Sequence, residues 1–478
     1  MLLSELIPDV ELQEDVEIRS LAFDDRQVVP GSLFFCVQGY SRDSHDFAAD
    51  AVEQGAAALV VERVLGLGVP EVVVESVRRS MGPLADRFYS HPSGDIDVIG
   101  ITGTNGKTTT AFLIRTILES IGIGCGLVGT VETIVGGEQQ SALRTTPEAI
   151  DLQRLFRTMA DAGDQAAAIE VSSHALELGR VDGTTFRVAA FTNLTQDHLD
   201  FHETFERYWQ AKARLFTELD PQMSVINIDD PHGVQLAESA PNPVTCSIDG
   251  KADWTITALA TGLRGSSFEI HSPIGTAHVE TPLTGRFNAQ NILVAAACCA
   301  AVGVSLDAIV AALRSAGQVP GRFEAIEEGQ AFAAVVDYAH TPDSLENVLS
   351  AARLIADGKV ICVVGCGGDR DSSKRPLMGE ISGRLADLTW VTSDNPRSED
   401  PSQIIDQIVA GIAGEYSVEP DRAEAIEAAL SAAQPGDVVV VAGKGHESGQ
   451  EFANREVVPF DDRDVVRTAL RKLVGDRL

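Results

Sequence analysis

The segment GTNGKTT at residues 103–109 constrains the fold most, because it joins a strand-like segment to a helix-like one. Residues 96–102 (IDVIGIT) are mainly apolar, and from Lys107 onward apolar residues recur at the spacing of one helix face. Glycines at such a junction let backbone N–H groups converge on phosphate oxygens, Lys107 can reach the terminal phosphates, and the Thr108 hydroxyl can bind Mg²⁺. The segment predicts a nucleoside triphosphate site. An ordinary glycine turn before a helix is the alternative, since Ile101 stands where the usual phosphate-loop pattern has Gly.

Strand-like and helix-like segments alternate along the chain, which predicts an α/β protein of three domains. Residues 1–95 form a small α/β domain, and residues 96–320 a central phosphate-loop ATPase domain with a mainly parallel sheet. Residues 321–478 form a C-terminal Rossmann-like domain, in which ligands lie at the carboxyl ends of the strands. Segments with Pro and Gly, HPSGD at 91–95 and QVPGRFE at 318–324, mark the expected boundaries.

Strands are expected where short apolar runs are bounded by polar or turn residues. These runs are 32–39, 56–62 and 71–75 in the first domain, 96–102, 166–171, 188–194 and 224–229 in the second, and 360–365, 388–393 and 437–443 in the third. Residues 253–283 differ, because they predict antiparallel strands joined by turns at GLRG and SPIG.

The formal net charge of −33 argues against general binding to nucleic acid or to an anionic membrane, since both require basic surface. No apolar run approaches the roughly 18 residues of a membrane span, and the first residues carry acids where a signal peptide carries basic residues. Seven cysteines without metal-type spacing predict reduced thiols. We therefore expect a cytoplasmic protein.

The chain resembles the Mur ligase family, ATP-dependent ligases of cell-wall precursor synthesis. GTNGKTT is similar to the variant phosphate loop of Mur ligases and folylpolyglutamate synthetases, and the remaining matches follow the family order. They are RTTPEAIDLQ (144–153), EVSSHAL (170–176), FTNLTQDHLDFH (191–202), YWQAKARLF (208–216), GRFNAQN (285–291), DYAHTPDSL (337–345), GCGGDRDSSKRP (365–376), DNPRSEDP (394–401) and GKGHE (443–447). DNPR marks the branch that uses diaminopimelate.

The resemblance implies an ATP site that is completed when the C-terminal domain closes on the central one. Its residues are Gly103, Thr104, Asn105, Gly106, Lys107, Thr108, Thr109, Asn291, Arg322, Asp337 and His340.

The resemblance also implies two Mg²⁺ ions, held by Thr108, Glu170, His198 and Lys212. Without it, Glu170 is as readily a solvated acid at a strand end, and His198 an ordinary loop histidine. Lys212 lies on a helix pattern where the ordinary expectation is a solvated lysine. In relatives the lysine at this position is carbamylated and helps to bind the second metal ion, and the same is implied here.

Two further groups of residues are implied for the nucleotide-linked peptide substrate. Contacts to the peptide come from Arg144, Thr145, Thr146, Ser172, Leu178 and Arg180. Arg144 stands where relatives often have Asn, and Leu178 where some have Gln. The first domain is expected to bind the uridine diphosphate end through Phe23, Asp25 and Arg26, although Asp25 replaces the usual Ser and can only accept a hydrogen bond when ionised.

The third domain is expected to select the amino acid that is added. Diaminopimelate carries a carboxylate and an ammonium at its far end, whereas lysine carries only an ammonium there. A planar guanidinium matches the carboxylate, and an acid accepts from the ammonium. The implied residues are Arg370, Asp394, Asn395, Pro396, Arg397, Gly443 and Glu447.

The implied reaction joins meso-2,6-diaminopimelate to the D-glutamate side chain of UDP-N-acetylmuramoyl-L-alanyl-D-glutamate through an acyl phosphate. Lys107, Arg180 and Lys212 are the expected catalytic residues, ATP and Mg²⁺ the cofactors, and the protein a monomer. Two kinds of alternative stay open: a lysine-adding or folate-glutamate ligase, and a nucleotide-gated binding module on a ligase fold.

Overall fold

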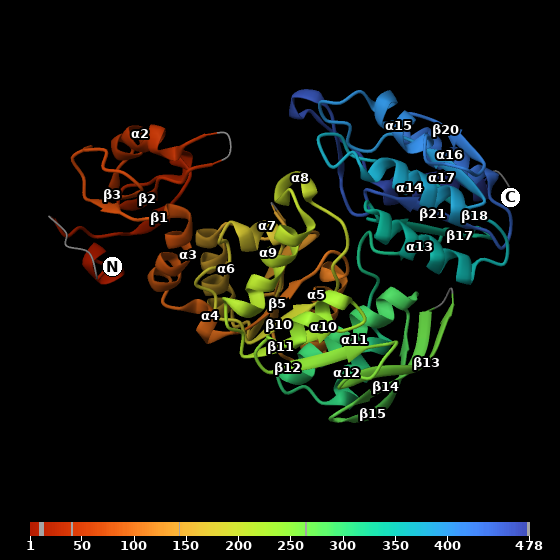
Figure 1. Ribbon diagram of the computed structural model, residues 1–478, viewed down its shortest axis with the longest axis horizontal. Helices are drawn as coiled ribbons and strands as arrows, with labels where there is room; N and C mark the ends of the chain where they lie inside the picture. The colour runs from red at the N-terminus through yellow and green to blue at the C-terminus, as the bar shows by residue number, and fades with distance from the viewer. Residues whose placement is uncertain (9–13, 40–41, 143, 263–264, 476–478) are drawn as a thin grey trace.

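The computed structural model describes the chain except for residues 9–13, 40–41, 143, 263–264 and 476–478. Three α/β units follow one another along the sequence, and each has its own sheet. Figure 1 shows the N-terminal and C-terminal units at opposite ends of the molecule, with the central unit between them. The predicted α/β class with three domains is confirmed.

The N-terminal unit is a four-stranded parallel sheet in the order β1-β2-β3-β4. Its elements are α1 (Leu3–Leu6), β1 (Ser20–Ala22), β2 (Ser32–Phe35), α2 (Ala48–Glu53), β3 (Ala56–Val61), β4 (Glu71–Val73) and α3 (Val77–Phe88). All three strands expected here are present. In the segment GYSRDSHDF, Tyr40 and Ser41 lie outside the described residues.

The centre of the middle sheet positions the phosphate loop. Strand β5 (Asp97–Thr102) lies between β9 (Ala166–Glu170) and β10 (Val188–Phe191), and all three are parallel. Helix α5 (Lys107–Ser120) packs on one face through a core shared with α11 (Arg286–Ala301), while the opposite face has a second core with α6 (Ala149–Ala162) and α9 (Phe205–Thr217). The segments after the three strands therefore meet at one edge of the sheet.

The remaining strands extend this sheet to eleven in the order β15-β14-β13-β12-β11-β10-β5-β9-β6-β7-β8. They are β6 (Cys125–Val128), β7 (Glu132–Val135), β8 (Glu138–Ser141), β11 (Met223–Asn227), β12 (Pro243–Ser247), β13 (Trp254–Gly262), β14 (Gly265–Ser272) and β15 (Gly275–Thr281). The antiparallel strands expected at 253–283 are present, although Leu263 and Arg264 of the GLRG turn lie outside the described residues.

Several features of the middle unit differ from the expectation, which also lacked strands β6 and β12. The hairpin strands β7 and β8 were not predicted, because β8 (EQQS) is polar and exposed and carries no apolar run. The segment at 91–95 is not an irregular linker, since Pro92–Asp95 form the short helix α4. Proline suits the first turn of a helix because that N–H has no intrahelical partner.

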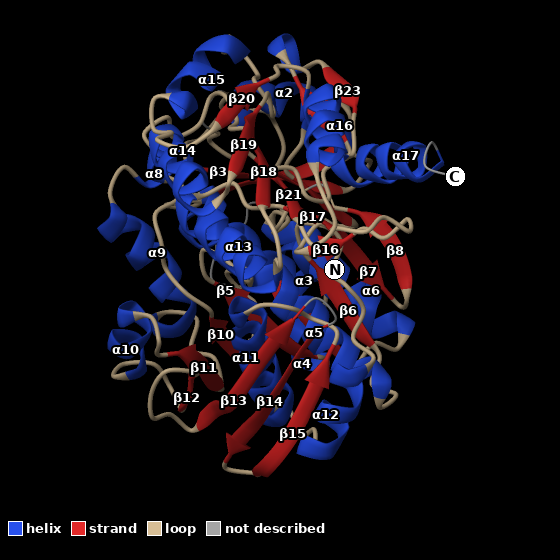
Figure 2. Ribbon diagram, turned by 90° about the vertical axis from the view of Figure 1, so that its right-hand side faces the viewer, coloured by secondary structure: helices blue, strands red, loops and turns tan. Residues whose placement is uncertain are grey.

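The C-terminal sheet has the order β16-β17-β21-β18-β19-β20, parallel except for the β16–β17 pair. Helices α13, α14 and α15 share a core with one face, and α16 and α17 with the other (Figure 2). The elements are β16 (Glu324–Ala325), β17 (Ala333–Asp337), α13 (Pro342–Ile355), β18 (Val360–Val364), α14 (Lys374–Leu385), β19 (Leu388–Val391), α15 (Pro401–Val409), β20 (Tyr416–Val418), α16 (Arg422–Ala432), β21 (Val438–Ala442), the hairpin β22 (Gly449–Glu451) and β23 (Val457–Pro459), and α17 (Asp462–Gly475).

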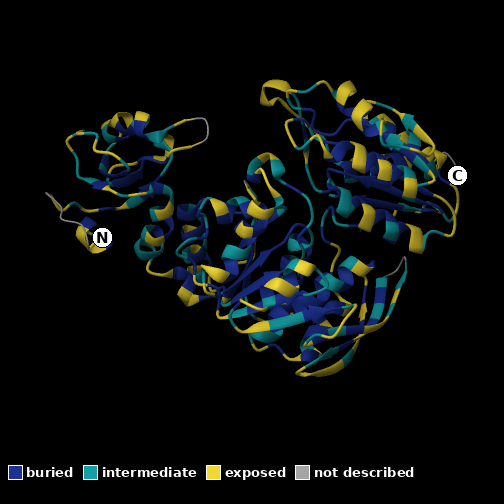
Figure 3. Cartoon of the chain, viewed as in Figure 1, coloured by how far each residue is buried: buried dark blue, intermediate teal, exposed yellow. Residues whose placement is uncertain are grey.

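Figure 3 shows the sheets as the buried interior of each unit, with exposed residues on the outer sides of the helices. All seven cysteines are free thiols and buried, as expected for reduced core residues. Within the described part of the chain, no helix combines the length and the apolar character needed to cross a membrane.

Candidate active site

Two glycines of the phosphate loop are required by its geometry. Gly103 and Gly106 have φ values of +149° and +85°, which side chains other than hydrogen rarely allow. A Cβ on Gly103 would lie 1.9 Å from the Thr192 hydroxyl, and one on Gly106 would lie 2.3 Å from the Asn291 amide oxygen. Lys107 folds back, so that its Nζ donates to the carbonyls of Gly103 and Thr104 at 2.9 and 2.8 Å. The loop is thus held open for a phosphate chain.

Glu170 ends strand β9 beside the phosphate loop. Its carboxylate accepts from the Thr108 hydroxyl at 3.0 Å and from the backbone N–H and hydroxyl of Thr130 at 2.8 and 3.0 Å. Burial lowers the pKa of Lys107, while the charge of Glu170 opposes that shift. Glu170 and Thr108 therefore present two hard oxygen ligands at the place where a metal-bound triphosphate would end.

Lys212 of α9 is buried directly beneath this loop. Its Nζ donates to the Gly103 carbonyl at 2.8 Å and lies 4.6 Å from the centre of the Tyr208 ring. Within the described chain it forms no ion pair with a carboxylate. Burial, reinforced by the charge of Lys107, lowers its pKa well below the ordinary value. The ordinary expectation of a solvated lysine is therefore wrong, and a neutral, nucleophilic amine is favoured.

His198 and His340 flank one carboxylate from different domains. Asp197 Oδ2 lies 3.4 Å from His198 Nε2 and 3.8 Å from His340 Nε2. Desolvation lowers the pKa of His198 to about 3, so its imidazole is neutral, the form that binds metal. Burial opposes ionisation of Asp197, but its basic neighbours His198, His340 and Lys374 lower its pKa below the usual range. His198 also adopts a φ of +54°, a strained conformation typical of functional sites.

These donors fit Mg²⁺ in the way that nucleotide-dependent enzymes usually hold it. Among the described residues, no three His, Cys, Asp or Glu side chains gather as a metal cluster. Magnesium is commonly held by one or two protein oxygens together with substrate phosphates and water. Glu170 and Thr108 match that pattern, whereas a second ion near His198 needs a further anion, which a carbamate on Lys212 would supply.

The C-terminal domain closes over the loop. Arg322 Nη2 donates to the Thr108 hydroxyl at 2.9 Å, and the Asn105 side-chain amide donates to Asp343 of α13 at 2.7 Å. Arg322 stacks on Tyr338 with 4.5 Å to the ring centre, and its buried Nε has no hydrogen-bond partner among the described residues. Burial raises the pKa of Asp337 to about 6, although Arg322 opposes that shift.

A cavity of about 450 Å³ lies between the two domains, within the range of ordinary ligand pockets. It brings together most of the predicted ATP and metal residues. They are Thr104, Asn105, Gly106, Lys107, Thr108, Thr109, Glu170, His198, Asn291, Arg322, Asp337 and His340, joined by Thr145 and Ser172. Gly103 and Lys212 lie just behind this lining.

The predicted peptide residues gather around Glu148. Its carboxylate contacts Arg78 of α3 at 3.2 Å, Arg144 at 2.5 Å and Arg180 at 2.9 Å. Arg180 also donates to the Thr146 carbonyl at 3.3 Å. One buried acid therefore fixes basic side chains from three segments, including one from the N-terminal domain.

The other peptide candidates lie close by. The Thr146 hydroxyl donates to the Glu170 carbonyl at 2.7 Å and accepts from the Ser172 backbone N–H at 3.1 Å. The Thr145 hydroxyl lies 3.1 Å from that of Thr130. Leu178 ends the short helix α7 (Ser173–Glu177) and is half-buried.

The uridine candidates lie apart from this cavity, after strand β1 of the N-terminal domain. Phe23 and Asp25 are half-buried, and Arg26 is exposed. Arg26 pairs with Asp24 through two bonds of 2.9 and 2.5 Å. The structure therefore does not bring Phe23, Asp25 and Arg26 to the phosphate loop.

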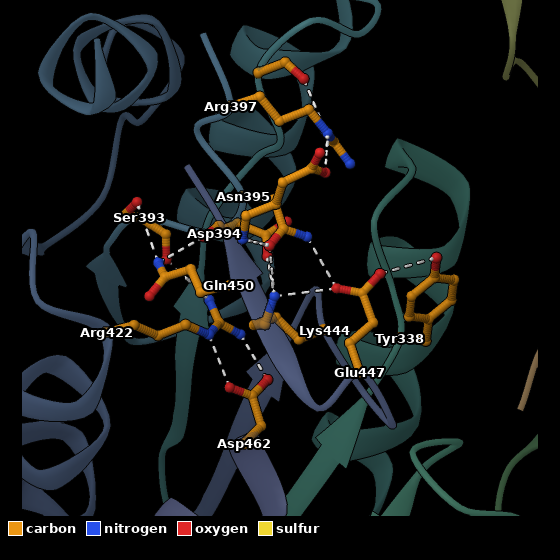
Figure 4. A network of polar contacts seen from close by, with 12 residues as sticks. Tyr338, Ser393, Asp394, Asn395, Arg397, Arg422, Lys444, Glu447, Gln450 and Asp462 are labelled. Carbon is orange, nitrogen blue, oxygen red and sulfur yellow. Dashed lines mark hydrogen bonds and ion pairs between the residues drawn. The ribbon is translucent and has the colours of Figure 1, made fainter. Parts of the chain in front are cut away.

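The amino-acid candidates lie on loops after neighbouring strands of the C-terminal sheet. The Asn395 side chain donates to Glu447 at 2.9 Å (Figure 4), and the Tyr338 hydroxyl approaches Glu447 at 3.5 Å. Asp394, Asn395, Pro396 and Gly443 are buried, and Arg370 is exposed. Tyr338 also lines the ATP cavity, so this cluster adjoins it.

The sequence suggested a guanidinium of Arg397 that is open to a ligand, but this group already has protein partners. Its Nε donates to Glu451 at 2.8 Å and its Nη1 to the Gly368 carbonyl at 2.7 Å. Arg397 holds a φ of +52°. A Cβ on Gly367 would lie 2.9 Å from Arg397 and 3.9 Å from Arg370, so both guanidinium side chains border the same glycine loop.

Sequence reasoning missed three charged residues here: Glu148, Asp197 and Lys444. Each stands inside a matched motif, one or two residues from a residue that was singled out. A charged side chain next to a candidate was the available signal, but its burial and partners were not visible. Lys444 has no exposed surface, and its Nζ contacts Asp394, Asn395 and Glu447.

A phosphate loop beneath a cavity closed by a Rossmann-like domain defines a three-domain, nucleotide-dependent enzyme. Family models match residues 17–89 as the Mur ligase family catalytic domain, 101–299 as the Mur ligase middle domain, and 321–445 as the Mur ligase glutamate ligase domain. The chain belongs to the Mur ligase family.

Two relatives share most of the length of the chain, and both are named UDP-N-acetylmuramoyl-L-alanyl-D-glutamate--2,6-diaminopimelate ligase. The one from Geobacillus kaustophilus (strain HTA426) is 50% identical over 467 residues, 95% of each chain. The one from Streptomyces coelicolor is 46% identical over 475 residues, 96% of this chain and 94% of the relative.

Solved structures agree in fold. A structure of a ligase of the same name superimposes with a TM-score of 0.73 and 35% identity, covering 99% of both chains. A Mycobacterium tuberculosis folylpolyglutamate synthase complexed with ADP and AMPPCP has a TM-score of 0.63 at 17% identity, covering 83% of this chain and 95% of its own, which shows a shared fold alone.

Proposed function

We propose that this protein is an ATP-dependent ligase that adds meso-2,6-diaminopimelate to UDP-N-acetylmuramoyl-L-alanyl-D-glutamate in peptidoglycan synthesis. The observation that carries the proposal is the juxtaposition of the phosphate-loop cavity with the charged cluster of Asn395, Arg397 and Glu447. The identity of 50% to a diaminopimelate ligase supports it. The protein acts as a cytoplasmic monomer in this proposal.

The reaction has two steps. The D-glutamate side-chain carboxylate attacks the γ-phosphorus of ATP, which forms an acyl phosphate and releases ADP. The neutral amine of diaminopimelate then attacks the acyl carbon, so that an amide forms, inorganic phosphate leaves and the amine loses a proton. Two anions must approach each other in the first step, which requires concentrated positive charge.

Lys107 and Arg180 supply that charge from opposite sides. Lys107 lies in the phosphate loop and binds the β- and γ-phosphates once they displace its own loop carbonyls. Arg180, which Glu148 contacts at 2.9 Å, is assigned to the peptide carboxylate. Mg²⁺, when bound by Thr108, Glu170, His198 and a carbamate on Lys212, neutralises phosphate charge and aligns the reacting oxygens.

Carbamylation of Lys212 follows from its environment. The neutral amine attacks the carbon of CO₂, forms a C–N bond and loses one proton, which leaves an anionic carbamate. Because burial lowers the pKa of Lys212, the neutral amine required for attack is more available than in a solvated lysine. The site thereby gains an anion without an additional acidic side chain.

Selection of the amino acid rests on the far end of diaminopimelate. The contacts of Arg397 use Nε and Nη1, and no described residue hydrogen-bonds to Nη2, so this nitrogen is assigned to the distal carboxylate. Glu447 accepts from the distal ammonium. Lysine lacks the carboxylate and would leave the guanidinium without its partner, which lowers its reactivity relative to diaminopimelate.

The uridine end is assigned to the N-terminal domain through Phe23, Asp25 and Arg26. The Arg26 side chain is 82% exposed, so a diphosphate can reach its guanidinium and take over the contact now made by Asp24. Arg78 and Glu148 connect that domain to the peptide residues, so the long substrate would lie across the junction of the two domains.

The test is ADP release by the purified protein with Mg-ATP and UDP-N-acetylmuramoyl-L-alanyl-D-glutamate, in the presence of meso-diaminopimelate, L-lysine or no amino acid. We expect release that depends on diaminopimelate, together with a product heavier than the substrate by one diaminopimelate residue. ADP release with lysine instead would support ligase activity but refute the proposed preference for diaminopimelate. Release with neither amine would favour a nucleotide-gated binding module.

A further inference from the structure

Lys444 is a buried cation at the centre of the proposed amino-acid site. It follows β21 and has no exposed surface. Its Nζ donates to Asn395 Oδ1 at 2.8 Å and to Glu447 Oε2 at 3.0 Å, and lies 3.4 Å from Asp394 Oδ1 (Figure 4). These three partners are residues assigned to diaminopimelate, whereas Lys444 itself has no surface left for a ligand.

The contact to Asn395 fixes which way its amide points. Asn395 Oδ1 accepts from Lys444 Nζ and from the Glu451 backbone N–H at 2.9 Å. Both contacts come from donors, so they require the oxygen on that side. The Asn395 NH₂ group is thereby directed at Glu447, to which it donates at 2.9 Å.

The contact to Glu447 fixes one of its two oxygens. Oε2 accepts from both Lys444 and Asn395, whereas among the described residues Oε1 has a single long contact, 3.5 Å to the Tyr338 hydroxyl. Oε1 is therefore the oxygen available to an incoming ammonium. The positive charge of Lys444 also offsets the repulsion between the nearby carboxylates of Asp394 and Glu447.

We propose that Lys444 is a positioning residue that presets Asn395 and Glu447 for the distal ammonium and carboxylate of the amino-acid substrate. It joins the loop after β19 to the loop after β21, so two segments about 50 residues apart act as one binding surface. The inference rests on the proposed function, since Asn395 and Glu447 are assigned to diaminopimelate there.

A second buried ion pair shows what a purely structural role would look like. Arg422 and Asp462 have no exposed side-chain surface and bond at 2.8 and 2.7 Å, and Arg422 Nη2 also donates to the Ala442 carbonyl. Within the described residues this pair makes no hydrogen bond to Asn395 or Glu447, although the charges of Asp394 and Glu447 act on Arg422 through space. Asp462→Asn is therefore the matched control for Lys444→Met.

The experiment measures steady-state kinetics of both variants for each substrate. We expect Lys444→Met to raise KM for diaminopimelate about 10- to 100-fold, the scale seen when a group that orients a ligand-binding residue is lost. KM for ATP should change less than about twofold, which also shows that the variant is folded. Asp462→Asn should lower the stability of the protein, and the ratio of KM for diaminopimelate to KM for ATP should stay as in the wild type.

A double-mutant cycle separates positioning from packing. Glu447→Gln should raise KM for diaminopimelate. In the double variant of Glu447→Gln and Lys444→Met, KM for diaminopimelate should exceed that of Glu447→Gln alone by no more than about twofold. Additive losses, or an unchanged KM for diaminopimelate in Lys444→Met, would overturn the proposal. If Lys444→Met fails to fold, Lys444→Gln, which also removes the charge, supplies the same comparison with the same expected rise in KM for diaminopimelate.

Failure of this inference is distinguishable from failure of the proposed function. If the wild-type protein does not use diaminopimelate, the proposed function itself is wrong. If it does, and Lys444→Met retains the wild-type KM for diaminopimelate, then only the positioning role is wrong.

Discussion

Two buried lysines, Lys212 and Lys444, have the same side chain and nearly the same burial but opposite surroundings. Lys212 is 1% exposed and meets a carbonyl and an aromatic ring, whereas Lys444 is fully buried and meets two carboxylates and an amide oxygen. A buried ammonium is costly unless it is paired. The first environment therefore favours a neutral, reactive amine and the second a permanent structural cation.

The comparison shows that partners, rather than burial, decide what a buried charged residue does. In the central domain no carboxylate of the described residues pairs with Lys212, which is the environment that the proposed carbamate and metal ion require. In the C-terminal domain the carboxylates are supplied by the protein, and Lys444 serves to orient them. The following predictions test that difference.

Removal of Lys212 has the largest expected effect. Lys212→Ala should lower ADP-forming turnover about a thousandfold, the scale of losing a group that stabilises transition-state charge, while Mg-ATP still binds. Added short carboxylates should restore part of the activity by occupying the place of the carbamate. Lys251→Met, at an exposed lysine, is the control and should retain full activity. Wild-type turnover of Lys212→Ala would contradict a role for this side chain.

Removal of Arg397 has the next largest effect. Arg397→Met should reduce the preference for diaminopimelate over lysine about a hundredfold, because the guanidinium that pairs with the distal carboxylate is gone. Competition between the two amino acids, read by mass spectrometry of the product, measures the ratio. Arg384→Met, at a surface ion pair with Glu346, should leave the ratio unchanged. An unaltered ratio in Arg397→Met would mean that other residues determine the preference for diaminopimelate.

Thermal stability should separate the two lysines. Lys444→Met leaves Asp394 and Glu447 without their cation and should lower the melting temperature of the C-terminal domain by roughly 5 °C. Lys212→Met removes a buried group that has no carboxylate partner among the described residues, and it should leave the central domain unchanged or more stable. Differential scanning calorimetry resolves both transitions, and equal destabilisation by the two substitutions would refute the contrast.

Asp337 gives the smallest effect and a defined pH dependence. Burial raises its pKa to about 6 from 3.8, so the folded state binds more protons than the unfolded state between these values. Its contribution to stability is therefore complete below about pH 3.8 and is lost as the pH rises through 6. Between pH 5 and 7 the free energy of unfolding of the wild type should fall by about 1 kcal/mol relative to that of Asp337→Asn. Parallel pH profiles from urea unfolding would contradict the shifted pKa.

Most of the fold could be predicted from the sequence because strands and their following loops carry local signals. The carboxyl ends of β5, β9 and β10 meet at one edge of the central sheet, so the phosphate loop, Glu170 and the segment with His198 converge without any information from distant residues. The loops after β18, β19 and β21 likewise meet at one edge of the C-terminal sheet. The polar, exposed β8 gave no such signal.

The partners of charged side chains could not be predicted in the same way. Lys212 shares the buried face of α9 with Tyr208, Ala211 and Leu215, a helical spacing that the sequence does contain. In contrast, Lys444 meets Asn395 across about 50 residues, and Glu148 collects arginines from three segments. Such contacts depend on how loops from different strands pack, which periodicity does not encode.

The most direct measurement is ¹³C NMR of the purified protein equilibrated with ¹³C-bicarbonate, comparing the wild type with Lys212→Met and Lys444→Met. The account predicts one carbamate resonance in the wild type, its retention in Lys444→Met and its loss in Lys212→Met. A wild-type protein without this resonance, or a resonance that persists in Lys212→Met, would contradict the claim that the two buried lysines have opposite chemical roles.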